Sequence, residues 1–197
     1  MIKNIIIASN NKNKIREMKS KLNPFGFDIV SQREAGYDID VEENGTTFRE
    51  NALLKARALY QLANKPVMSD DAGLEVDFLD GAPGVYSARF CGPDATDKDK
   101  YNKILELMKD VKDESKRTAR FVCTICYIDE NGTEHFFEGK CEGKIAFAPQ
   151  GDNGFGYDPI FLVGEESFAE ISEEEKNKIS HRGLAINKLL EYLRDTK

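Results

Sequence analysis

The sequence predicts an α/β fold in which helices flank a mixed central β-sheet. Helical and extended patterns alternate toward both ends of the 197-residue chain. In the middle, residues 118–129 and 133–141 read as two strands joined by "ENGT", which contains the Asn-Gly hairpin signal. A hairpin does not occur in a purely parallel sheet, so we expect a mixed one. No repeat or linker divides the chain, and we expect one domain with two lobes around a cleft.

The first predicted strand is followed by a polar, basic turn. Residues 5–8, "IIIA", read as a strand buried on both faces, and Ile15, Met18 and Leu22 then give a helix with one apolar stripe. The backbone N–H groups where such a helix begins favour anions. The turn lacks the glycines of a Walker A or dinucleotide-binding loop. An ordinary solvated turn with an Asn cap is the alternative.

The next elements lead to a pair of acids. "FDIVS" reads as a strand, and Thr47-x-x-Glu50 is a capping box that opens a helix. "KPVMSDDAG" reads as a strand that ends in acids and turns at Gly73, with a second short strand in "LEVDFLDGAPG". The apolar face of the helix is expected to comprise Phe48, Ala52, Leu59 and Leu62.

Three more helices and a pair of cysteines complete the outline. Thr96 or Asp97 caps a helix in "TDKDKYNKILELMKD", Ser172-x-x-Glu175 opens another, and "HRGLAINKLLEYLRD" is the last. Cys123 and Cys126 form a C-x-x-C pattern within a predicted strand. Residues three apart on a strand point to opposite faces, so these thiols are expected to be buried and reduced, with neither a bridge nor a metal between them.

The charge distribution favours a small anionic ligand. The net charge of −7 argues against broad binding to duplex nucleic acid, whereas residues 1–21 carry six basic side chains and a single acid. No apolar stretch approaches the length of a membrane span, and no signal peptide follows Met1. We therefore expect no membrane or nucleic-acid partner and a cytoplasmic location.

Two acidic pairs suggest a metal site. Glu42 and Glu43 precede the Thr47 cap, and Asp70 and Asp71 stand at the predicted strand end. Adjacent carboxylates repel each other unless a cation or donors lie between them. Mg²⁺ binds one or two carboxylates and completes its shell with water and phosphate oxygens. The alternative for Asp70 or Asp71 is a cap on the turn at Gly73.

An aromatic residue between two glycines suggests a platform for a base. In "GDNGFGYDPIF", Gly154 and Gly156 flank Phe155, and Tyr157 and Asp158 follow. Glycines allow the backbone to bend close to a ligand, and bases stack on aromatic rings. A glycine-kinked edge strand with a core aromatic is the alternative.

A donor pair stands near the end of the chain. In "EEEKNKISHRG", His181 and Arg182 occupy a break between helices, and Lys176 precedes them. Such donors suit a carbonyl or a phosphate, whereas a capping or surface role is the alternative. The basic turn, the acids, the aromatic platform and the donors are together the parts that hold a nucleoside triphosphate with magnesium.

The sequence resembles the inosine/xanthosine triphosphate pyrophosphatase family over residues 8–183. The matching segments are "ASNNKNKIREM", "ENALLKA", "SDDAGLEVDFLDGAPGVYSARF", "GFGYDPIF" and "ISHRG". The resemblance implies a single pyrophosphatase domain over residues 1–197, a homodimer and Mg²⁺ dependence. It also implies cleavage of dITP, ITP, XTP or dXTP into the monophosphate and pyrophosphate.

The resemblance also implies roles for individual residues. Asp71 matches the catalytic acid and metal ligand, and Glu42 and Glu43 match an acidic pair near the metal. Asn10 stands where glycine is usual and Ala72 where serine is common. The implied substrate-binding residues are Ser9, Asn10, Asn11, Lys12, Asn13, Lys14, Ala72, Phe155, Gly156, Tyr157, Asp158, Lys176, His181 and Arg182.

In the mechanism that we hypothesise from the sequence, Lys14 and the first turn hold the triphosphate while a water oriented by Asp71 attacks. Arg182, which only donates, favours a 6-oxo purine over adenine. Three other interpretations stay open at this point. They are a nucleotide sensor without catalysis, a phosphosugar- or nucleic-acid-binding module, and a pyrophosphatase acting on modified pyrimidine or standard nucleotides.

Overall fold

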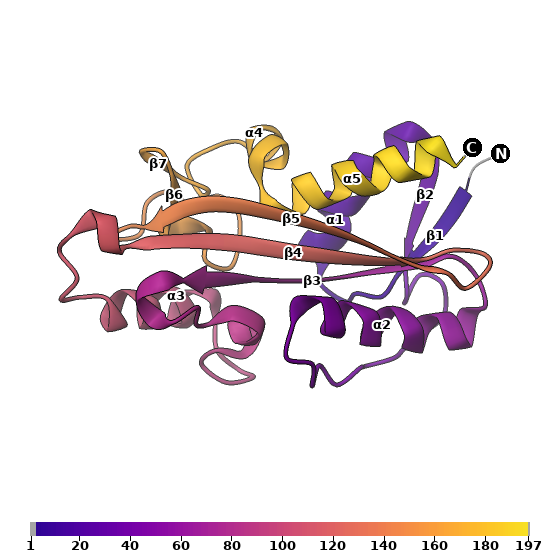
Figure 1. Ribbon diagram of the computed structural model, residues 1–197, viewed down its shortest axis with the longest axis horizontal. Helices are drawn as coiled ribbons and strands as arrows, with labels where there is room; N and C mark the ends of the chain where they lie inside the picture. The colour runs from indigo at the N-terminus through magenta and orange to yellow at the C-terminus, as the bar shows by residue number, and fades with distance from the viewer. Residues whose placement is uncertain (1–2, 197) are drawn as a thin grey trace. The chain divides into compact units, whose positions relative to one another are not determined.

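The computed structural model describes residues 3–196, which form a mixed seven-stranded sheet with flanking helices (Figure 1). The strand order is β2-β1-β3-β4-β5-β6-β7. β1 pairs in parallel with β2 and β3, whereas β6 pairs antiparallel with β5 and β7. The predicted α/β class with a mixed sheet is therefore confirmed. The strands are β1 (Lys3–Ile7), β2 (Phe27–Ser31), β3 (Val67–Val76), β4 (Thr118–Ile128), β5 (Glu134–Ile145), β6 (Phe161–Val163) and β7 (Glu166–Ser167).

The helices follow the predicted order along the chain. The α-helices are α1 (Lys12–Leu22), α2 (Phe48–Ala63), α3 (Asp97–Leu107), α4 (Glu173–Ile179) and α5 (His181–Asp195). Short 3₁₀ turns are η1 (Asn23–Phe25), η2 (Asp77–Leu79), η3 (Gly84–Arg89), η4 (Glu114–Lys116) and η5 (Asp158–Ile160). Within the described residues, no helix combines the length and the apolar character that a membrane span requires.

The chain divides into two compact units. Unit 1 comprises Met1–Asp71, Cys123–Gly139 and Arg182–Lys197. Unit 2 comprises Ala72–Val122 and Lys140–His181. A single domain with two lobes around a cleft stays a prediction.

Unit 1 sandwiches its strands between helices. β1 and β2 run in register, with Ile5 opposite Ile29. Figure 1 shows α2 on one face of these strands and α1 with α5 on the other, and Lys21 of α1 donates to Asn187 of α5 at 3.4 Å. Burial of the apolar side chains between these layers provides the main stabilisation. The cluster beneath α2 comprises Ile6, Ala8, Ala52, Ala56, Leu59, Ala63, Val67, Cys126 and Ile128.

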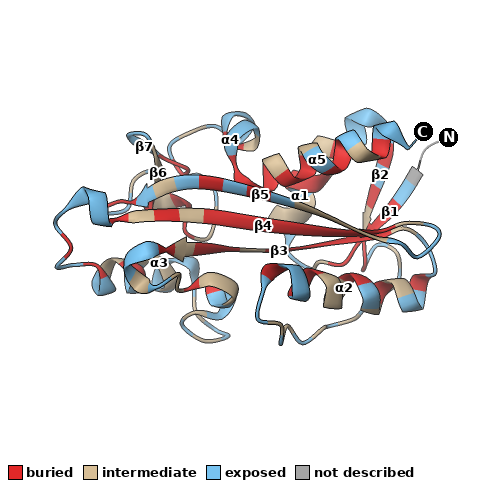
Figure 2. Cartoon of the chain, in the orientation of Figure 1, coloured by how far each residue is buried: buried red, intermediate tan, exposed pale blue. Residues whose placement is uncertain are grey.

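Unit 2 has a separate aromatic core. The ring centroid of Phe121 lies 4.6 Å from that of Phe161 and 5.9 Å from that of Phe168. Arg117 is buried in this unit and donates to the carbonyls of Met108, Val111, Ile145 and Ala146. Figure 2 shows that β3 and β4 are buried along most of their length.

The predicted break at Gly73 is wrong, because β3 runs without interruption from Val67 to Val76. Asp70 and Asp71 therefore lie within a strand and do not cap a turn. β3 lies between β1 and β4 in the sheet, and pairing with such neighbours extends a strand through residues that favour turns when isolated.

The predicted helix starts are confirmed with one change of detail. Thr96 and Ser172 cap α3 and α4 in complete capping boxes. Thr47 caps α2, but Glu50 accepts from the N–H and hydroxyl of Thr46 instead of completing the box. Leu62 of α2 is 57% exposed, so its predicted place on the apolar face is wrong.

The cysteines within the described residues are reduced, as predicted. Cys123 and Cys126 are buried on β4, and burial raises the pKa of both thiols to about 12. Cys91 is the exposed cysteine of the described chain.

Candidate functional site

The turn before α1 is built by its own side chains. Asn11 caps the helix, and its side-chain oxygen accepts from the N–H groups of Asn13 and Lys14 at 3.0 and 3.2 Å. Ser9 Oγ accepts from the N–H of Asn11 at 3.2 Å, and Asn10 Oδ1 accepts from Gln32 at 3.2 Å. The predicted Asn cap is therefore present, whereas anion binding at this turn stays a prediction. Two of the N–H groups expected to bind phosphate are engaged by that cap.

The pleat of β3 separates the two adjacent aspartates. Successive side chains of a strand point to opposite faces. Asp70 Oδ2 lies 3.0 Å from Lys14 Nζ of α1 and 3.2 Å from Arg182 Nε of α5. Asp71 instead accepts from Asn51 Nδ2 of α2 at 3.1 Å, and Lys55 Nζ lies 3.8 Å from its Oδ1. Each carboxylate thus has its own partners on its own face of the sheet.

The two faces give the acids opposite titration behaviour. Burial alone would raise the pKa of Asp70, but the charges of Lys14 and Arg182 outweigh it and hold the pKa well below its usual value. Burial raises the pKa of Asp71, and the charges of Lys55 and Lys14 only partly oppose that rise. Asp70 is therefore a fixed anion, whereas Asp71 has the character of a proton acceptor.

Lys55 connects Glu43 to Asp71. Its Nζ lies 2.8 Å from Glu43 Oε1 as well as 3.8 Å from Asp71. Burial opposes the charge of Lys55, but Asp71, Asp70 and Glu43 together raise its pKa above the ordinary value. Glu43 is thereby associated with Asp71, whereas Glu42 forms no ion pair of this kind within residues 3–196.

The carboxylates fit a magnesium ion that relies on substrate oxygens. Among residues 3–196, no group of three or more His, Cys, Asp or Glu side chains is arranged to hold a metal. Mg²⁺ requires only one or two protein carboxylates when phosphates and water complete its shell. Asp71 and Glu43 supply two oxygen donors of the correct kind. On the other face of β3, Asp70 Oδ1 is buried without a hydrogen-bond partner among the described residues.

Arg182 and His181 are both buried, which excludes the surface role considered for them. Arg182 Nη1 lies 2.5 Å from Glu17 Oε2, and its Nε bonds Asp70, so the guanidinium bridges two acids of unit 1. His181 belongs to unit 2, where its ring stacks on Phe121 with centroids 4.6 Å apart. The chain thus places these neighbouring residues in different surroundings.

The aromatic-glycine segment forms a bend in unit 2, as predicted. Gly154 and Gly156 adopt φ angles of +76° and +66°, the left-handed region that favours glycine. The N–H of Phe155 donates to Asp158 Oδ2 at 2.8 Å, and the N–H of Gly156 donates to Asp97 Oδ2 at 2.7 Å. Tyr157 is anchored by donation from its hydroxyl to the carbonyl of Ser87 at 2.8 Å.

A buried ion pair supports this bend. Lys176 Nζ lies 2.6 Å from Asp158 Oδ2 and 4.7 Å from the centroid of the Phe155 ring. The same lysine therefore fixes the carboxylate that holds the Phe155 peptide and places a positive charge over the aromatic ring. The structure thus brings Lys176 to Phe155 and Asp158, although Lys176 lies in a separate segment of the sequence.

Several residues of the site were missed from the sequence. Lys55 and Asn51 lie on α2, where "ENALLKA" places them four residues apart and hence on one helical face. Polar residues on the buried side of an otherwise apolar helix are a signal that could have identified them. Glu17 and Asp97 offered no such signal, because their partners are distant in the sequence.

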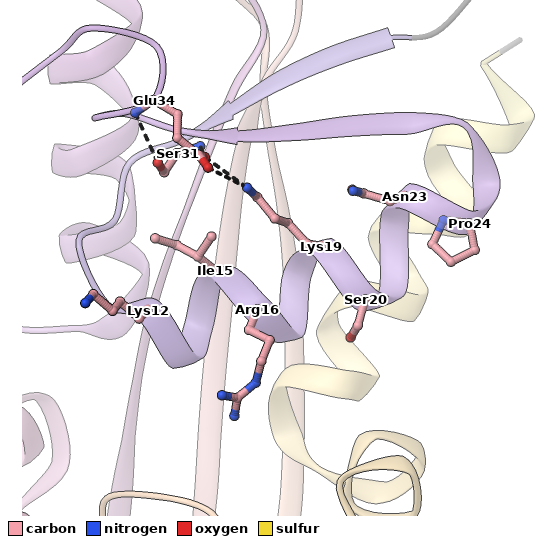
Figure 3. Close-up of a pocket in the computed structure, with 9 residues that line it drawn as sticks. All are labelled: Lys12, Ile15, Arg16, Lys19, Ser20, Asn23, Pro24, Ser31 and Glu34. Carbon is pink, nitrogen blue, oxygen red and sulfur yellow. Dashed lines mark hydrogen bonds and ion pairs between the residues drawn. The ribbon is translucent and has the colours of Figure 1, made fainter.

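A surface hollow of about 680 Å³ lies elsewhere on unit 1, along α1, η1 and β2. Figure 3 shows Lys12, Ile15 and Arg16 on its α1 side and the Lys19–Glu34 ion pair across it. The Lys19–Glu34 distance is 2.9 Å, and the lining contains neither Asp70 nor Asp71. The hollow is therefore not the centre defined by the two aspartates.

Comparison with known proteins gives a consistent result. A model of the Ham1 family matches residues 5–192. The dITP/XTP pyrophosphatase of Vibrio cholerae is 46% identical over 200 residues, which cover 100% of this chain and 99% of that protein. The Escherichia coli K12 protein of the same name is 48% identical over 195 residues, which cover 97% and 98%.

Solved structures agree with the sequence comparisons. The Ham1 protein of Staphylococcus aureus superposes with a TM-score of 0.89 at 42% identity and covers 99% of this chain and 100% of that chain. A nucleoside-triphosphatase / dITP/XTP pyrophosphatase from Mycobacterium abscessus superposes with a TM-score of 0.76 at 38% identity and covers 95% and 98%.

Proposed function

Since this chain belongs to the Ham1 family, we infer that it is a nucleoside-triphosphate pyrophosphatase that hydrolyses dITP and XTP to the monophosphate and pyrophosphate. One structural observation supports hydrolysis by an activated water molecule. Asp71 is buried on β3 with a raised pKa, between Asn51 and a lysine that also holds Glu43. A carboxylate in these surroundings suits the removal of a proton from an attacking water.

The catalytic step assigned to this chain uses fixed charges around β3. Asp71 accepts the proton of a water that attacks the α-phosphorus, while Asn51 keeps its carboxylate oriented. Lys14 and Lys55 oppose the negative charge that develops on the pyrophosphate leaving group, which is the usual requirement in phosphoryl transfer. Asp70 keeps Lys14 and Arg182 in place, because its own charge is held by both.

We further propose that Mg²⁺ is the cofactor and that Asp71 and Glu43 hold it. The ion supplies charge neutralisation at the phosphate oxygens and lowers the pKa of water. Glu43 is preferred to Glu42 because Lys55 joins it to Asp71. Glu43→Gln should raise the Mg²⁺ concentration for half-maximal activity and weaken Mn²⁺ binding followed by electron paramagnetic resonance. Glu42→Gln is the matched control, and equal effects of the two variants would refute the choice of Glu43.

We propose a role in base recognition for the unit 2 bend and, separately, for Arg182 of unit 1. Phe155 provides a surface on which a purine stacks. Arg182 donates and never accepts, so it favours the 6-oxo group of hypoxanthine or xanthine over the 6-amino group of adenine. A buried polar group left unpaired costs about 1–3 kcal/mol, which corresponds to roughly tenfold to hundredfold discrimination.

We also propose that the enzyme is a homodimer that acts on the cytoplasmic nucleotide pool. Phe78 and Tyr86 of unit 2 are 49% and 57% exposed, and large exposed apolar side chains are typical of protein interfaces. Sedimentation velocity should give twice the 22.2 kDa chain mass. Phe78→Ser combined with Tyr86→Ser should shift the protein to monomer, and an unchanged dimer would exclude this surface.

The deciding experiment measures pyrophosphate release with Mg²⁺ from dITP, XTP, dATP, dGTP and dTTP. We expect strong turnover of dITP and XTP, and its loss in Asp71→Asn. The matched control is Asp28→Asn, which changes an exposed acid on β2 and should keep full activity. Nucleotide binding without pyrophosphate release would favour a sensor, and equal turnover of all five would place the chain among pyrophosphatases without purine selectivity.

A further inference from the structure

The backbone on either side of the Phe155 ring is held by two carboxylates from different places in the chain. The N–H of Phe155 donates to Asp158, three residues away, whereas the N–H of Gly156 donates to Asp97, 59 residues away. Both distances, 2.8 and 2.7 Å, are in the range of charge-assisted hydrogen bonds. Asp158 belongs to the motif already assigned to the base, but Asp97 lies at the first residue of α3.

Asp97 is not needed to cap the helix on which it lies. Thr96 and Asp99 form the complete capping box of α3, with Asp99 Oδ2 accepting from the N–H of Thr96 at 2.9 Å. The two oxygens of Asp97 have other partners. Oδ1 lies 3.3 Å from Lys100 Nζ, and Oδ2 accepts from the N–H of Gly156. Lys100 thus orients the carboxylate, and the carboxylate reaches the bend.

The bend needs such a restraint. Gly154 and Gly156, at φ +76° and +66°, have more accessible conformations than any other residue type. The orientation of the Phe155 ring therefore depends on how firmly the two flanking peptide groups are held. Asp158 is fixed by Lys176 at 2.6 Å on one side of Phe155, and Asp97 holds the peptide on the other.

We propose that Asp97 is a positioning residue for base recognition, which fixes the peptide after Phe155 so that the ring is held in the orientation that stacks on the purine. This inference rests on the proposed function and adds to it a residue outside the motif. The role proposed for Asp97 requires no contact with the phosphates or the base. It acts through the backbone of Gly156.

The kinetic test separates binding from chemistry. With dITP and Mg²⁺, Asp97→Ala should raise KM roughly tenfold, the typical effect of losing one charge-assisted hydrogen bond. Its kcat should stay within about twofold of the wild type, because the charges assigned to the phosphates lie on β3, α1 and α2. Asp97→Asn keeps an acceptor oxygen and should recover most of the lost affinity.

A matched control distinguishes this role from general support of the helix. Asp99→Ala removes the capping-box acid two residues away and destabilises the start of α3 without removing the Gly156 hydrogen bond. Asp99→Ala should therefore leave KM near the wild-type value. If both alanine variants raise KM equally, or if Asp97→Ala lowers kcat at unchanged KM, the positioning role is overturned.

A spectroscopic measurement tests the contact without relying on turnover. In ¹⁵N-labelled protein, the amide proton of Gly156 should resonate downfield, and Asp97→Ala should shift it upfield while Asp99→Ala does not. A shifted Gly156 amide with no hydrolysis of dITP by the wild-type chain would refute the proposed function but not the contact. Hydrolysis of dITP together with an unmoved amide in Asp97→Ala would refute the positioning role alone.

Discussion

Substituting Gly154 by alanine tests the buried ion pair beneath the Phe155 bend. A Cβ added at Gly154 would lie 2.1 Å from Asp158 Oδ2, 2.9 Å from its Cγ and 3.1 Å from its Cβ. Asp158 has little room to yield, because it is buried and bound to Lys176 and to the Phe155 peptide. The alanine must therefore displace either the bend or the carboxylate.

The magnitude follows from two contributions. A non-glycine residue at φ +76° costs about 1–2 kcal/mol in backbone conformation. Displacing one member of a buried ion pair costs about 3–5 kcal/mol, because the other charge is left without its partner. Gly154→Ala should therefore lower the free energy of unfolding by about 4–7 kcal/mol and should raise KM for dITP.

Gly156→Ala supplies the matched control. Gly156 also has a positive φ, +66°, but a Cβ there would meet no atom within 4 Å. Only the backbone contribution of about 1–2 kcal/mol applies. Urea denaturation followed by circular dichroism should separate the two variants by about 3–5 kcal/mol. Variants that agree within about 0.5 kcal/mol would show that the Asp158–Lys176 pair does not restrain the bend.

Three further outcomes are expected. Lys55→Met should lower the free energy of unfolding by about 3 kcal/mol, because the buried acids lose their compensating charge. Adding Asp71→Asn should recover part of this loss. A double-mutant cycle in urea measures the coupling, and additive losses would refute it. Iodoacetamide at pH 8 should alkylate Cys91 in the native protein and leave Cys123 unmodified. The pKa of Cys123, about 12, keeps only about one part in 10⁴ of this thiol as the reactive thiolate. Peptide mass spectrometry measures the labelling, and alkylation of Cys123 would contradict the prediction. Arg117→Met should destabilise unit 2 by more than about 3 kcal/mol, because four buried carbonyls lose their donors; a thermal midpoint equal to the wild type would exclude this role.

Local features of the fold were predictable because they depend on neighbouring residues. The Asn11, Thr96 and Ser172 caps arise from side chains two or three positions from their partners, so the sequence contains all that is needed. The strand from Val67 to Val76 was not predictable in this way. Its continuity through Gly73 depends on pairing with strands whose positions only the folded sheet defines.

Candidate site residues could be chosen from the sequence, but their partners in the fold could not. The sequence identified Asp71, Phe155 and Arg182 by type and motif. It did not indicate that Arg182 bridges Asp70 to Glu17, 165 residues away, because such ion pairs depend on packing between distant segments. The roles assigned to these residues in binding and catalysis stay predictions.

The alternation of side chains along β3 has a consequence for engineering. Asp70 and Asp71 are adjacent in the chain, yet one serves α1 and α5 while the other serves α2. Substitutions at the two positions should nevertheless be coupled, because the charges of Lys14 and Lys55 act on both acids. Deleting a single codon between Val67 and Ser69 would instead exchange the two faces, presenting the wrong acid to each set of partners. Library designs for this enzyme should thus keep both aspartates and preserve the length of β3.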